Sequence, residues 1–451
     1  MNTKNRRSLC ARVPVWSTLC ALLFFGTVGV LPARAQGISG RDRDRGKVML
    51  NTIKNDIKKE YYDPTFHGID IEARFKQAEE KMNQADSLGQ IFGIVAQVLI
   101  EFDDSHLIFF PPDRMTSTEY GWQMQAIGDR CYVIAVKPGS DAEAKGLKVG
   151  DQVLSVDTFR PTRDNMWKLN YLYKTLRPRP GVRLTVASPG EQQRQLDVMA
   201  NTRVGKRVYD LTRNGSGADR ADLIRESENE DYLNRQRYVS FGDELFIWKM
   251  PQFDLDEAGV DDMMDKARKH KALILDLRRN SGGYEVILQR MLSYFLKEDE
   301  KIADLKRRKE TKPLTVKSRG DRSFKGKLVV LVDSRSASSS EIFARVIQMG
   351  RLGTVIGDRT AGAVMRAKQW GYQLGVDTVA LYGASITDAD VIMADGNSLE
   401  KVGVTPDELL LPTAADLAAR RDPVLARAAA IAGVKLDPEK AGSLFPIEWR
   451  K

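Results

Sequence analysis

A serine-rich turn between a buried strand and a helix is the segment of this 451-residue chain best suited to carry chemistry. It follows the apolar run 328–332, reads D-S-R-S-A-S-S-S-E (333–341), and leads into apolar residues at helical spacing from Ile342 onward. A serine at such a turn lies at the positive end of the helix beside free backbone N–H groups, which favours an oxyanion and helps a hydroxyl to act as a nucleophile. Taken alone, the turn also fits ordinary helix capping, in which serine is common.

Two more segments carry residue types that such a reaction needs. A second apolar strand ends in D-L-R-R-N-S-G-G-Y (276–284), where Gly282 and Gly283 allow a backbone N–H to approach a reacting carbonyl closely. A third segment runs from the turn at 395–396 through Glu400 to G-V-T-P-D (403–407). Each segment alone is also compatible with a simple turn or loop.

The elements that must position these segments form an α/β core. The run 328–332 is continuously apolar, and 273–277 is apolar apart from Asp276, as expected of strands that are buried on both faces of a sheet. Each precedes a helix-like segment, which is typical of α/β proteins. We therefore predict a core at 241–412 and a helical tail at 413–451 that packs on its outside.

The other parts of the chain differ from the core in their patterns. Residues 36–115 are predicted to be helical, with Ser87 as an N-cap. Residues 116–200 alternate short strands with Gly and Pro turns and two helices, which predicts a small half-open β-barrel. The strands are expected at 131–136, 152–156, 182–187 and 192–198, and the helices near 141–145 and 163–175. Residues 201–240 carry many charges of both signs and are predicted to be a solvated linker.

The first 35 residues have the composition of an export signal. They contain five basic residues and no acidic one, an apolar run at 15–31, and A-R-A at 33–35, which together make up a secretory signal peptide. A membrane anchor is the alternative, but the run is short for a span of about 20 residues and is interrupted by Ser17, Thr18 and Gly26. The sequence predicts an exported protein, periplasmic or secreted, with no membrane span once the signal is removed.

The formal charge of +9, from 70 Lys and Arg against 61 Asp and Glu, invites a nucleic-acid interpretation. Removal of residues 1–35 takes away five positive charges and leaves +4. The most basic remaining stretch, 301–322, also carries Asp304 and Glu310 and is predicted to be a solvated hairpin or loop. We therefore expect no nucleic-acid partner.

Cysteine and histidine are too scarce in the mature chain for a zinc cluster. Two of the three cysteines lie in the signal peptide, so Cys131, in an apolar strand-like run, has no disulfide partner within the mature chain. The three histidines are His67, His106 and His270, of which the first and last have surface-like surroundings. We expect neither a metal nor a cofactor.

Taken together and in this order, the motifs resemble those of the tail-specific, or C-terminal-processing, serine peptidase family, including its tricorn-type branch. The resemblance covers most of the mature chain: a helical N-terminal part, a PDZ-like insert with its S-x-A-x-x-A-G-L-x-x-G-D stretch at 140–151, and then D-L-R-x-N-x-G-G, S-A-S-x-S-E, T-x-G and G-V-x-P-D runs. It implies a multidomain α/β (α+β) protein whose peptidase core is of the ClpP/crotonase-like kind.

The resemblance also implies roles for individual residues. It places the nucleophile at Ser338 and the oxyanion donors at the N–H of Ser339 and of one glycine of the 282–283 pair. The processing peptidases carry a general-base lysine in a T-x-G-K-G run, but this chain reads T-A-G-A-V at 360–364, with Ala363 in place of the lysine. A shifted Ser/Lys dyad through Lys368 is one alternative.

The tricorn-type branch instead uses a Ser-His pair from the N-terminal region and a glutamate before G-V-x-P-D. The matching residues here are Ser105, His106 and Glu400. Neutral imidazole, with an unperturbed pKa of about 6.5, can accept the proton of Ser338. Ser105 would hydrogen-bond the ring or the substrate, and Glu400 would orient a second group. The competing interpretation of His106 is a packing or capping residue after a helix.

The PDZ-like insert would engage the substrate. Such domains take a peptide as an added strand and hold its C-terminal carboxylate on backbone N–H groups. The expected loop is at 120–124, with Gly121, Trp122, Gln123 and Met124 as substrate-binding residues. The predicted function is an exported serine endopeptidase that cleaves unfolded or tail-exposed polypeptides. The alternative is a catalytically inactive relative that binds peptides or ligands, and the sequence leaves the oligomeric state open.

Overall fold

The structure is a computed structural model that describes residues 38–112, 116–204, 232–375 and 380–449. The predicted signal peptide at 1–35 and the part of the predicted linker at 205–231 lie outside the described residues. The linker predicted at 201–240 is wrong at both of its described ends, because Asn201–Val204 and Arg237–Phe241 are paired strands. The fold mixes helices and sheets, in agreement with the predicted multidomain α/β class.

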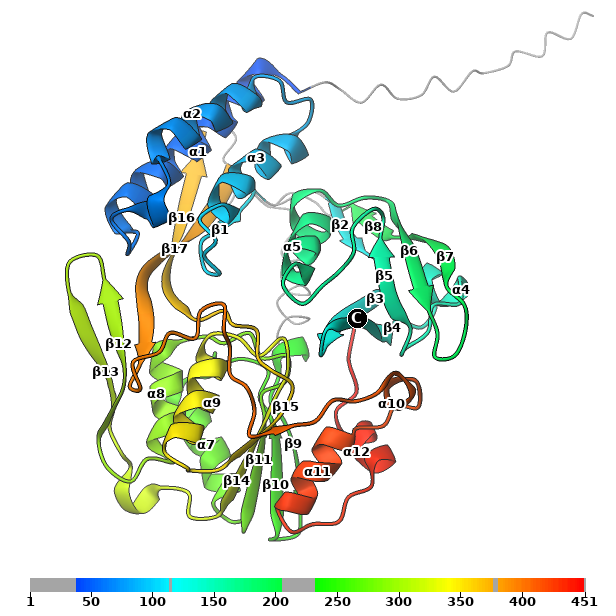
Figure 1. Ribbon diagram of the computed structural model, residues 1–451, viewed down its shortest axis with the longest axis vertical. Helices are drawn as coiled ribbons and strands as arrows, with labels where there is room; N and C mark the ends of the chain where they lie inside the picture. The colour runs from blue at the N-terminus through cyan, green and yellow to red at the C-terminus, as the bar shows by residue number, and fades with distance from the viewer. Residues whose placement is uncertain (1–37, 113–115, 205–231, 376–379, 450–451) are drawn as a thin grey trace, which may run out of the picture. The chain divides into compact units, whose positions relative to one another are not determined.

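The core is a six-stranded sheet in the order β18-β15-β14-β11-β10-β9, in which only the edge strand β9 runs antiparallel to its neighbour (Figure 1). Its strands are β9 (Arg237–Phe241), β10 (Leu245–Lys249), β11 (Ala272–Asp276), β14 (Lys327–Val332), β15 (Thr354–Gly357) and β18 (Glu408–Leu409). The two continuous apolar runs recognised in the sequence are the central strands β11 and β14. Their residues are buried on both faces, as predicted for a parallel sheet.

Helices cover the two faces of this sheet. Alternate strand residues such as Trp248 and Leu275 pack against α7 (Glu257–Ala267), α8 (Glu285–Ser293) and α9 (Ser339–Met349). The intervening residues such as Ile274 pack against the tail helices α11 (Pro423–Ile431) and α12 (Pro438–Leu444), which follow the short α10 (Ala414–Ala418). The predicted helical tail therefore closes the second face of the core sheet.

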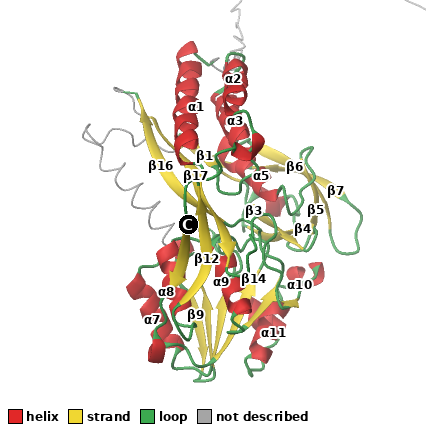
Figure 2. Cartoon of the chain, turned by 60° about the vertical axis from the view of Figure 1, so that its left-hand side comes forward, coloured by secondary structure: helices red, strands yellow, loops and turns green. Residues whose placement is uncertain are grey.

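A long two-stranded ribbon connects the core to the N-terminal helices. Figures 1 and 2 show β16 (Met365–Leu374) and β17 (Ala380–Met393) running from those helices to the core. The first half of β17, including Ile386, packs into the helical cluster, and its second half, including Val391, packs into the core. β17 also pairs with the hairpin β12 (Glu300–Arg307) and β13 (Thr311–Val316), which forms part of the basic stretch 301–322.

The N-terminal part is only partly as predicted. The helices are α1 (Gly40–Glu60), α2 (Ile71–Met82) and α3 (Leu88–Ile100), and Ser87 caps α3 as expected, since its Oγ accepts from the N–H of Gln90. The prediction that 36–115 is helical is wrong at its end, because Ile108–Phe110 is a strand, β1, that pairs antiparallel with β17. The partner strand lies more than 270 residues away, so no local periodicity signals this pairing.

The insert contains a five-stranded antiparallel sheet in sequence order, with β3 at its edge. Its strands are β3 (Trp122–Ile127), β4 (Arg130–Val136), β5 (Gln152–Val156), β6 (Gly181–Ala187) and β7 (Arg194–Met199), flanked by the two-stranded β2 (Thr116–Glu119) and β8 (Asn201–Val204). All four predicted strands are present, as are both predicted helices, α4 (Asp141–Ala144) and α5 (Met166–Tyr171), the latter extended by the π-helical turn η2 (Leu172–Leu176). Cys131 is buried in β4.

One local expectation for the insert is wrong. The substrate loop was predicted at 120–124, but the backbone from Trp122 onward is already strand β3. Only Gly121 keeps a turn conformation, with φ of 72°, and a Cβ there would lie 2.4 Å from the Cβ of Ser140. The chain therefore turns tightly at Gly121 and pairs with β4 at once.

Candidate active site

The loops that follow β11 and β14 lie side by side, because the two strands pair in parallel. Hydrogen bonds join these loops: the N–H of Ala337 and the Oγ of Ser340 both donate to the carbonyl of Asn280, at 3.0 Å. The Oγ of Ser336 donates to the carbonyl of Leu277 at 2.8 Å. The serine-rich turn is thereby attached directly to the glycine turn at the end of β11.

Ser338 lies at the start of α9 in a strained backbone conformation. Its φ of 56° and ψ of −119° are uncommon for a residue with a side chain. Its N–H donates to the carbonyl of Ala363 at 2.8 Å and to Oε2 of Glu341 at 3.1 Å. Gly282 packs against this turn so closely that a Cβ would come within 2.6 Å of the Ser338 Cβ. The neighbouring turns thus enforce the strain, as is common at functional sites.

The imidazole of His106 faces Ser338. Nε2 lies 3.3 Å from Oγ, a long hydrogen bond of the kind that shortens when substrate binds. The backbone N–H of His106 donates to Oδ1 of Asp104 at 2.8 Å, and the Asp104 carboxylate also accepts from Tyr61 and Thr387. Asp104, which sequence reasoning did not single out, therefore anchors the histidine loop to the end of α1 and to β17.

Ser105 and Glu400 complete a chain of hydrogen bonds behind the histidine. The Oγ of Ser105 lies 2.8 Å from Nδ1 of His106 and 2.8 Å from Oε2 of Glu400, and the Ser105 N–H donates to Oε1 at 3.0 Å. A carboxylate only accepts, so the Ser105 hydroxyl donates to Glu400 and its oxygen accepts from Nδ1–H. This assignment leaves the lone pair of Nε2 directed at Ser338. From the sequence, Ser105 could bond either the His106 ring or the substrate, and in the structure its Oγ bonds the ring.

Burial governs the charges in this chain of residues. It lowers the pKa of His106, against the opposing influence of Asp104, so the imidazole is neutral at neutral pH. Burial also raises the pKa of Glu400, against the hydrogen bonds from Ser105 and from the N–H of Val364. A neutral imidazole beside a hydroxyl is the arrangement that proton abstraction requires.

Two backbone N–H groups adjoin Ser338 and have no acceptor within the described parts of the chain: those of Gly283 and Ser339. The N–H of Gly282 instead donates to Oδ1 of Asn280 at 2.8 Å, and the Asn280 amide donates to the carbonyl of Met250 at 3.0 Å. Of the predicted glycine pair, Gly283 is therefore the one with a donor available for an oxyanion. Asn280, which sequence analysis did not assign, selects between the two.

Glu341 is a second residue that sequence analysis did not assign. Its side chain is buried on the first turn of α9 and accepts hydrogen bonds from the hydroxyl of Thr360 and from the N–H groups of Gly362 and Ala363, besides that of Ser338. Burial raises its pKa to about 7 in spite of these hydrogen bonds. Glu341 thus joins the nucleophile turn to the 360–364 turn. The only sequence signal was its place in the S-A-S-x-S-E run.

The shifted Ser/Lys dyad is not formed in the structure. Lys368 lies on β16 with its Nζ 3.3 Å from Glu60 and 3.7 Å from Asp388. Its neighbours Ala367 and Gln369 line the cleft that contains Ser338, and Lys368 does not, as expected from alternation along a strand.

An open cleft of about 920 Å³ contains Ser338, His106 and Gly283. Its wall mixes polar and apolar side chains, with contributions from α8, α9 and the strands β12, β13, β16 and β17. The apolar lining residues are Val286, Leu288, Leu305, Leu314, Ile342, Met365 and Val391. The cleft thus offers both apolar surface and hydrogen-bonding groups beside Ser338.

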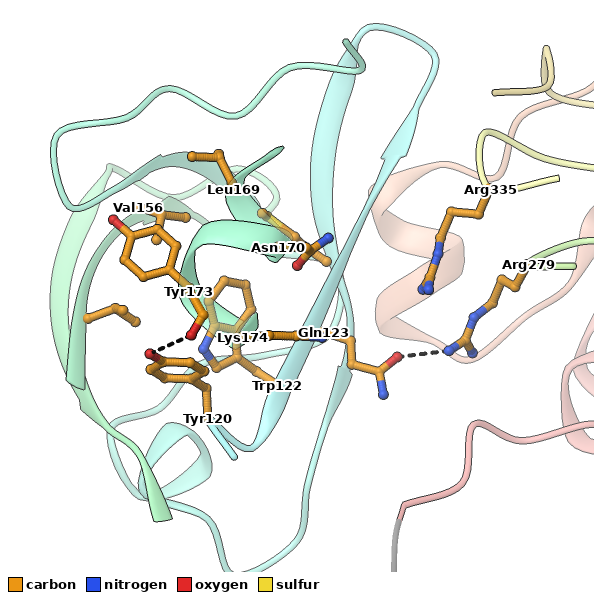
Figure 3. A pocket seen from close by; sticks show the side chains of 12 residues that line it. Tyr120, Trp122, Gln123, Val156, Leu169, Asn170, Tyr173, Lys174, Arg279 and Arg335 are labelled. Carbon is orange, nitrogen blue, oxygen red and sulfur yellow. Dashed lines mark hydrogen bonds between the residues drawn. The ribbon is translucent and has the colours of Figure 1, made fainter. Parts of the chain in front are cut away.

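The predicted substrate-binding residues lie elsewhere, in a second pocket. Trp122, Gln123 and Met124 line a cavity of about 180 Å³ between β3 and α5, shown in Figure 3, whereas Gly121 does not line it. The carboxamide oxygen of Gln123 accepts from the guanidinium of Arg279, on the loop that carries the oxyanion glycine. The structure therefore brings three of the four residues to one pocket.

Among the described residues, no group of three or more His, Cys, Asp or Glu side chains is arranged to hold a metal ion. Within the same residues, none of the helices has the length and apolar content needed to cross a bilayer.

A serine, a neutral imidazole held by a carboxylate-bound hydroxyl, and two N–H groups without an acceptor among the described residues are the groups that a serine hydrolase uses. Residues 247–410, which include Ser338 and Glu400, match the model of Peptidase family S41. This segment belongs to that family. The predicted resemblance to the tail-specific and C-terminal-processing peptidases is confirmed.

Individual relatives agree with this classification. The chain is 23% identical over 391 residues to the tail-specific protease of Haemophilus influenzae, covering 81% of this chain and 52% of that protein. It is 26% identical over 344 residues to the carboxyl-terminal-processing protease of Picosynechococcus sp., covering 71% and 73%. The chain thus spans about half the length of the first of these relatives. A crystal structure of mature CPAF superposes with a TM-score of 0.62 at 16% identity, covering 84% of this chain and 94% of that one, which supports the fold.

The buried carboxylate of Glu341 gives a first prediction. In Glu341→Gln an amide NH₂ replaces one acceptor oxygen and faces N–H donors, and each unsatisfied buried group costs about 1–3 kcal/mol of the free energy of unfolding. We expect a lower thermal midpoint and a lower kcat, with a much smaller change in KM. Glu191→Gln, at an exposed glutamate, is the control in calorimetry and steady-state kinetics. Equal midpoints for the two variants would contradict the role assigned to Glu341.

The same groups predict the pH dependence. The pKa of Glu341 is raised to about 7, and protonation removes acceptor capacity for the N–H of Ser338, so kcat/KM should fall as the pH decreases through 7. The pKa of His106 is lowered below 6.5, so a second loss should follow only at lower pH. Profiles of kcat/KM should show both losses in the wild type and only the lower one in Glu341→Gln. Identical profiles would exclude titration of Glu341.

Proposed function

We propose that this protein is a serine endopeptidase that cleaves unfolded or tail-exposed polypeptides. The observation that carries the proposal is the continuous chain of hydrogen bonds from Glu400 through Ser105 and His106 to Ser338, which ends beside the free N–H of Gly283. The names of the relatives, tail-specific and carboxyl-terminal-processing protease, support a polypeptide substrate.

In the proposed mechanism Ser338 attacks the scissile carbonyl while His106 Nε2 takes its proton. The oxyanion of the tetrahedral intermediate is held by the N–H groups of Gly283 and Ser339. His106 then returns the proton to the leaving amine, and a water molecule hydrolyses the acyl-enzyme by the same steps in reverse order. Glu400, through Ser105, stabilises the imidazolium that forms twice in each cycle.

The substrate would bind as an extended strand. The cleft beside Ser338 is open, and apolar residues in its mixed wall, such as Leu288 and Ile342, would contact an apolar side chain near the scissile bond. The insert, as a PDZ-like domain, would engage a second part of the same polypeptide. We further propose export through the predicted signal peptide, so that the substrates are periplasmic or extracellular proteins.

The catalytic assignment predicts a ranked series of losses in the cleavage of a dye-labelled unfolded polypeptide. Ser338→Ala and His106→Gln should lower kcat by roughly 10⁴-fold or more, since nucleophile and base act as a unit. Ser105→Ala, which breaks the link to Glu400, should cost roughly 10²-fold.

The control is Lys368→Met, which removes a lysine bound to Glu60 and should leave cleavage intact. If Lys368→Met lost activity while Ser105→Ala kept it, the result would favour a Ser338/Lys368 dyad over the Ser338/His106 pair. A wild type as inert as Ser338→Ala, with peptide binding retained, would instead favour the alternative of an inactive binding protein.

A further inference from the structure

A large apolar pocket lies between the N-terminal helices and the insert. Its walls come from α2, α3, α5 and the π-helical turn η2, and in Figure 1 α3 lies between α2 and α5. The pocket has a volume of about 540 Å³, within the range of about 300–1,000 Å³ that is usual for small-molecule sites. The residues that line it differ from those that line the cleft with Ser338. Its apolar lining includes Ala78, Ile94, Val98, Tyr171, Leu172 and Leu176.

Gly93 lines the pocket from the interior of α3, where glycine is less favourable for a helix than alanine. A Cβ at Gly93 would meet nothing within 4 Å, so packing among the described residues does not require a glycine there. Gly46 in α1 differs, since a Cβ would lie 2.5 Å from a methyl group of Ile91. Gly93 thus keeps backbone accessible at the wall of the pocket, as glycine does where a ligand approaches closely.

The charged side chains that line the pocket are all cations. They are Arg74, Lys81, Lys168 and Arg177, and three glutamines supply further polar lining. Arg74 is paired with Glu101. In the parts of the chain that the structure describes, the other three form neither an ion pair nor a side-chain hydrogen bond, and Lys168 contacts only the ring of Trp167, at 5.5 Å. All three are exposed, so their charges lie toward solvent, at the mouth of the pocket.

An apolar pocket with unpaired cations at its mouth is complementary to an amphiphile that has an apolar chain and an anionic head. Apolar lining favours burial of the chain, and lysine and arginine bind a carboxylate by charge-assisted hydrogen bonds. A cationic or zwitterionic amphiphile would place positive charge beside these side chains. A single-chain fatty acid has the required charge, and its unbranched chain fits against the bare backbone of Gly93.

We propose that the pocket between α2, α3 and η2 binds a long-chain fatty acid. The acyl chain lies against Ile94, Leu172 and the backbone of Gly93, and the carboxylate lies among the exposed cations Lys81, Lys168 and Arg177. The site itself does not depend on the proposed function, because the argument uses only the lining of this pocket.

Tyr171 connects the pocket to the loop that carries the catalytic histidine. Its side chain lines the pocket, and its hydroxyl donates to the carbonyl of Phe109 in β1, the strand that begins two residues after His106. Phe109 also contacts Phe92 of α3, with ring centroids 6.2 Å apart. An occupant that orders α3 and η2 therefore also fixes the strand that positions His106. We expect occupancy to raise kcat severalfold, and this consequence alone rests on the proposed function.

The test is isothermal titration calorimetry of the purified protein with dodecanoate, kept below the concentration at which it forms micelles. Two ligands serve as comparisons: dodecyltrimethylammonium, which has the same chain with a cationic head, and butanoate, which has the same head on a short chain. We expect dodecanoate to bind as a single molecule per chain, and both comparison ligands to bind roughly tenfold more weakly or worse.

Gly93→Leu tests the location of the site. The leucine side chain points into the pocket without meeting a neighbour and should abolish dodecanoate binding. The matched control is Gly40→Leu at the start of α1, outside the pocket, where a Cβ also meets nothing within 4 Å and binding should persist. A thermal midpoint of Gly93→Leu at or above that of the wild type, as expected when a helix loses a glycine, shows that the variant is folded.

A triple variant tests the role of the cations. It should lose the preference for dodecanoate over dodecyltrimethylammonium, whereas a control with the same change of charge outside the pocket should keep it. The triple variant is Lys81→Gln, Lys168→Gln and Arg177→Gln, and the control is Lys76→Gln, Lys145→Gln and Lys297→Gln, at exposed lysines.

Each contrary result overturns a stated part of the proposal. A wild type that shows no saturable binding of dodecanoate overturns the site, and binding that survives Gly93→Leu overturns its location. Equal affinity for the cationic amphiphile overturns the role of the three cations. A dimer that dissociates in Gly93→Leu, seen by sedimentation in a protein that does not bind dodecanoate, overturns the fatty acid in favour of a second copy of the chain.

The effect on activity is measured separately, as kcat for an unfolded polypeptide with and without dodecanoate. A rise in the wild type that is absent in Gly93→Leu supports the connection through Tyr171. An unchanged kcat with dodecanoate bound overturns that connection and leaves the site. Binding of dodecanoate by a protein that cleaves no polypeptide under either condition overturns the proposed function and leaves the fatty-acid site standing.

Discussion

Antiparallel pairing of the three-residue strand β1 with β17 is the constraint on which the active site depends. Ser105 and His106 are separated from β1 only by Leu107 and lie more than 200 residues before Ser338 in the chain. The pairing of Phe109 with Ala384, together with the hydrogen bond from Thr387 to Asp104, fixes the loop that carries the histidine. Because β17 continues into the core, the N-terminal helices and the parallel sheet are joined through one strand, and the base reaches the nucleophile along it.

Burial sets the protonation states of Glu341, Glu400 and His106. Glu341 and Glu400 are both carboxylates whose pKa is raised by burial, and both are met by backbone N–H groups. Each holds a turn: Glu341 the nucleophile turn, and Glu400 the histidine loop through Ser105. The burial that makes these carboxylates costly also keeps the imidazole neutral, so a single physical cause sets both the rigidity of the site and the protonation state of its base.

The sequence predicts the local elements well and the long-range ones poorly. The strands β11 and β14 are evident because parallel strands buried on both faces are continuously apolar, and the serine turn is evident from its place between strand and helix. Strand β1 and the early start of β3 depend on pairing partners, so a local pattern does not reveal them. The candidate residues Ser338, His106, Ser105 and Glu400 were found by motif, yet the order of their hydrogen bonds follows only from coordinates.

Sequence analysis did not identify the residues whose side chains position the backbone of neighbouring turns. In the sequence, Glu341 resembles a glutamate at a helix start and Asn280 a turn residue. Both side chains act by accepting hydrogen bonds from backbone N–H groups, and no sequence pattern identifies such contacts. Asn280 accepts the N–H of Gly282, so of the two glycines only Gly283 has an N–H without an acceptor among the described residues. The same limit applies to Arg279, whose hydrogen bond to Gln123 of the insert depends on how its loop lies against β3.

The alanine at position 363 shows how this site departs from a lysine dyad. In a dyad the base follows the nucleophile helix within the same domain, so the core alone contains the catalytic pair. Here the N–H of Ala363 donates to Glu341, and its carbonyl accepts from Ser338, so the turn that would carry the lysine serves to fix the nucleophile. The base then has to come from the N-terminal part, by way of β1 and β17. The position of His106 relative to Ser338 therefore depends on the packing of the N-terminal helices on β17, where Tyr382 and Ile386 are buried, as well as on the fold of the core.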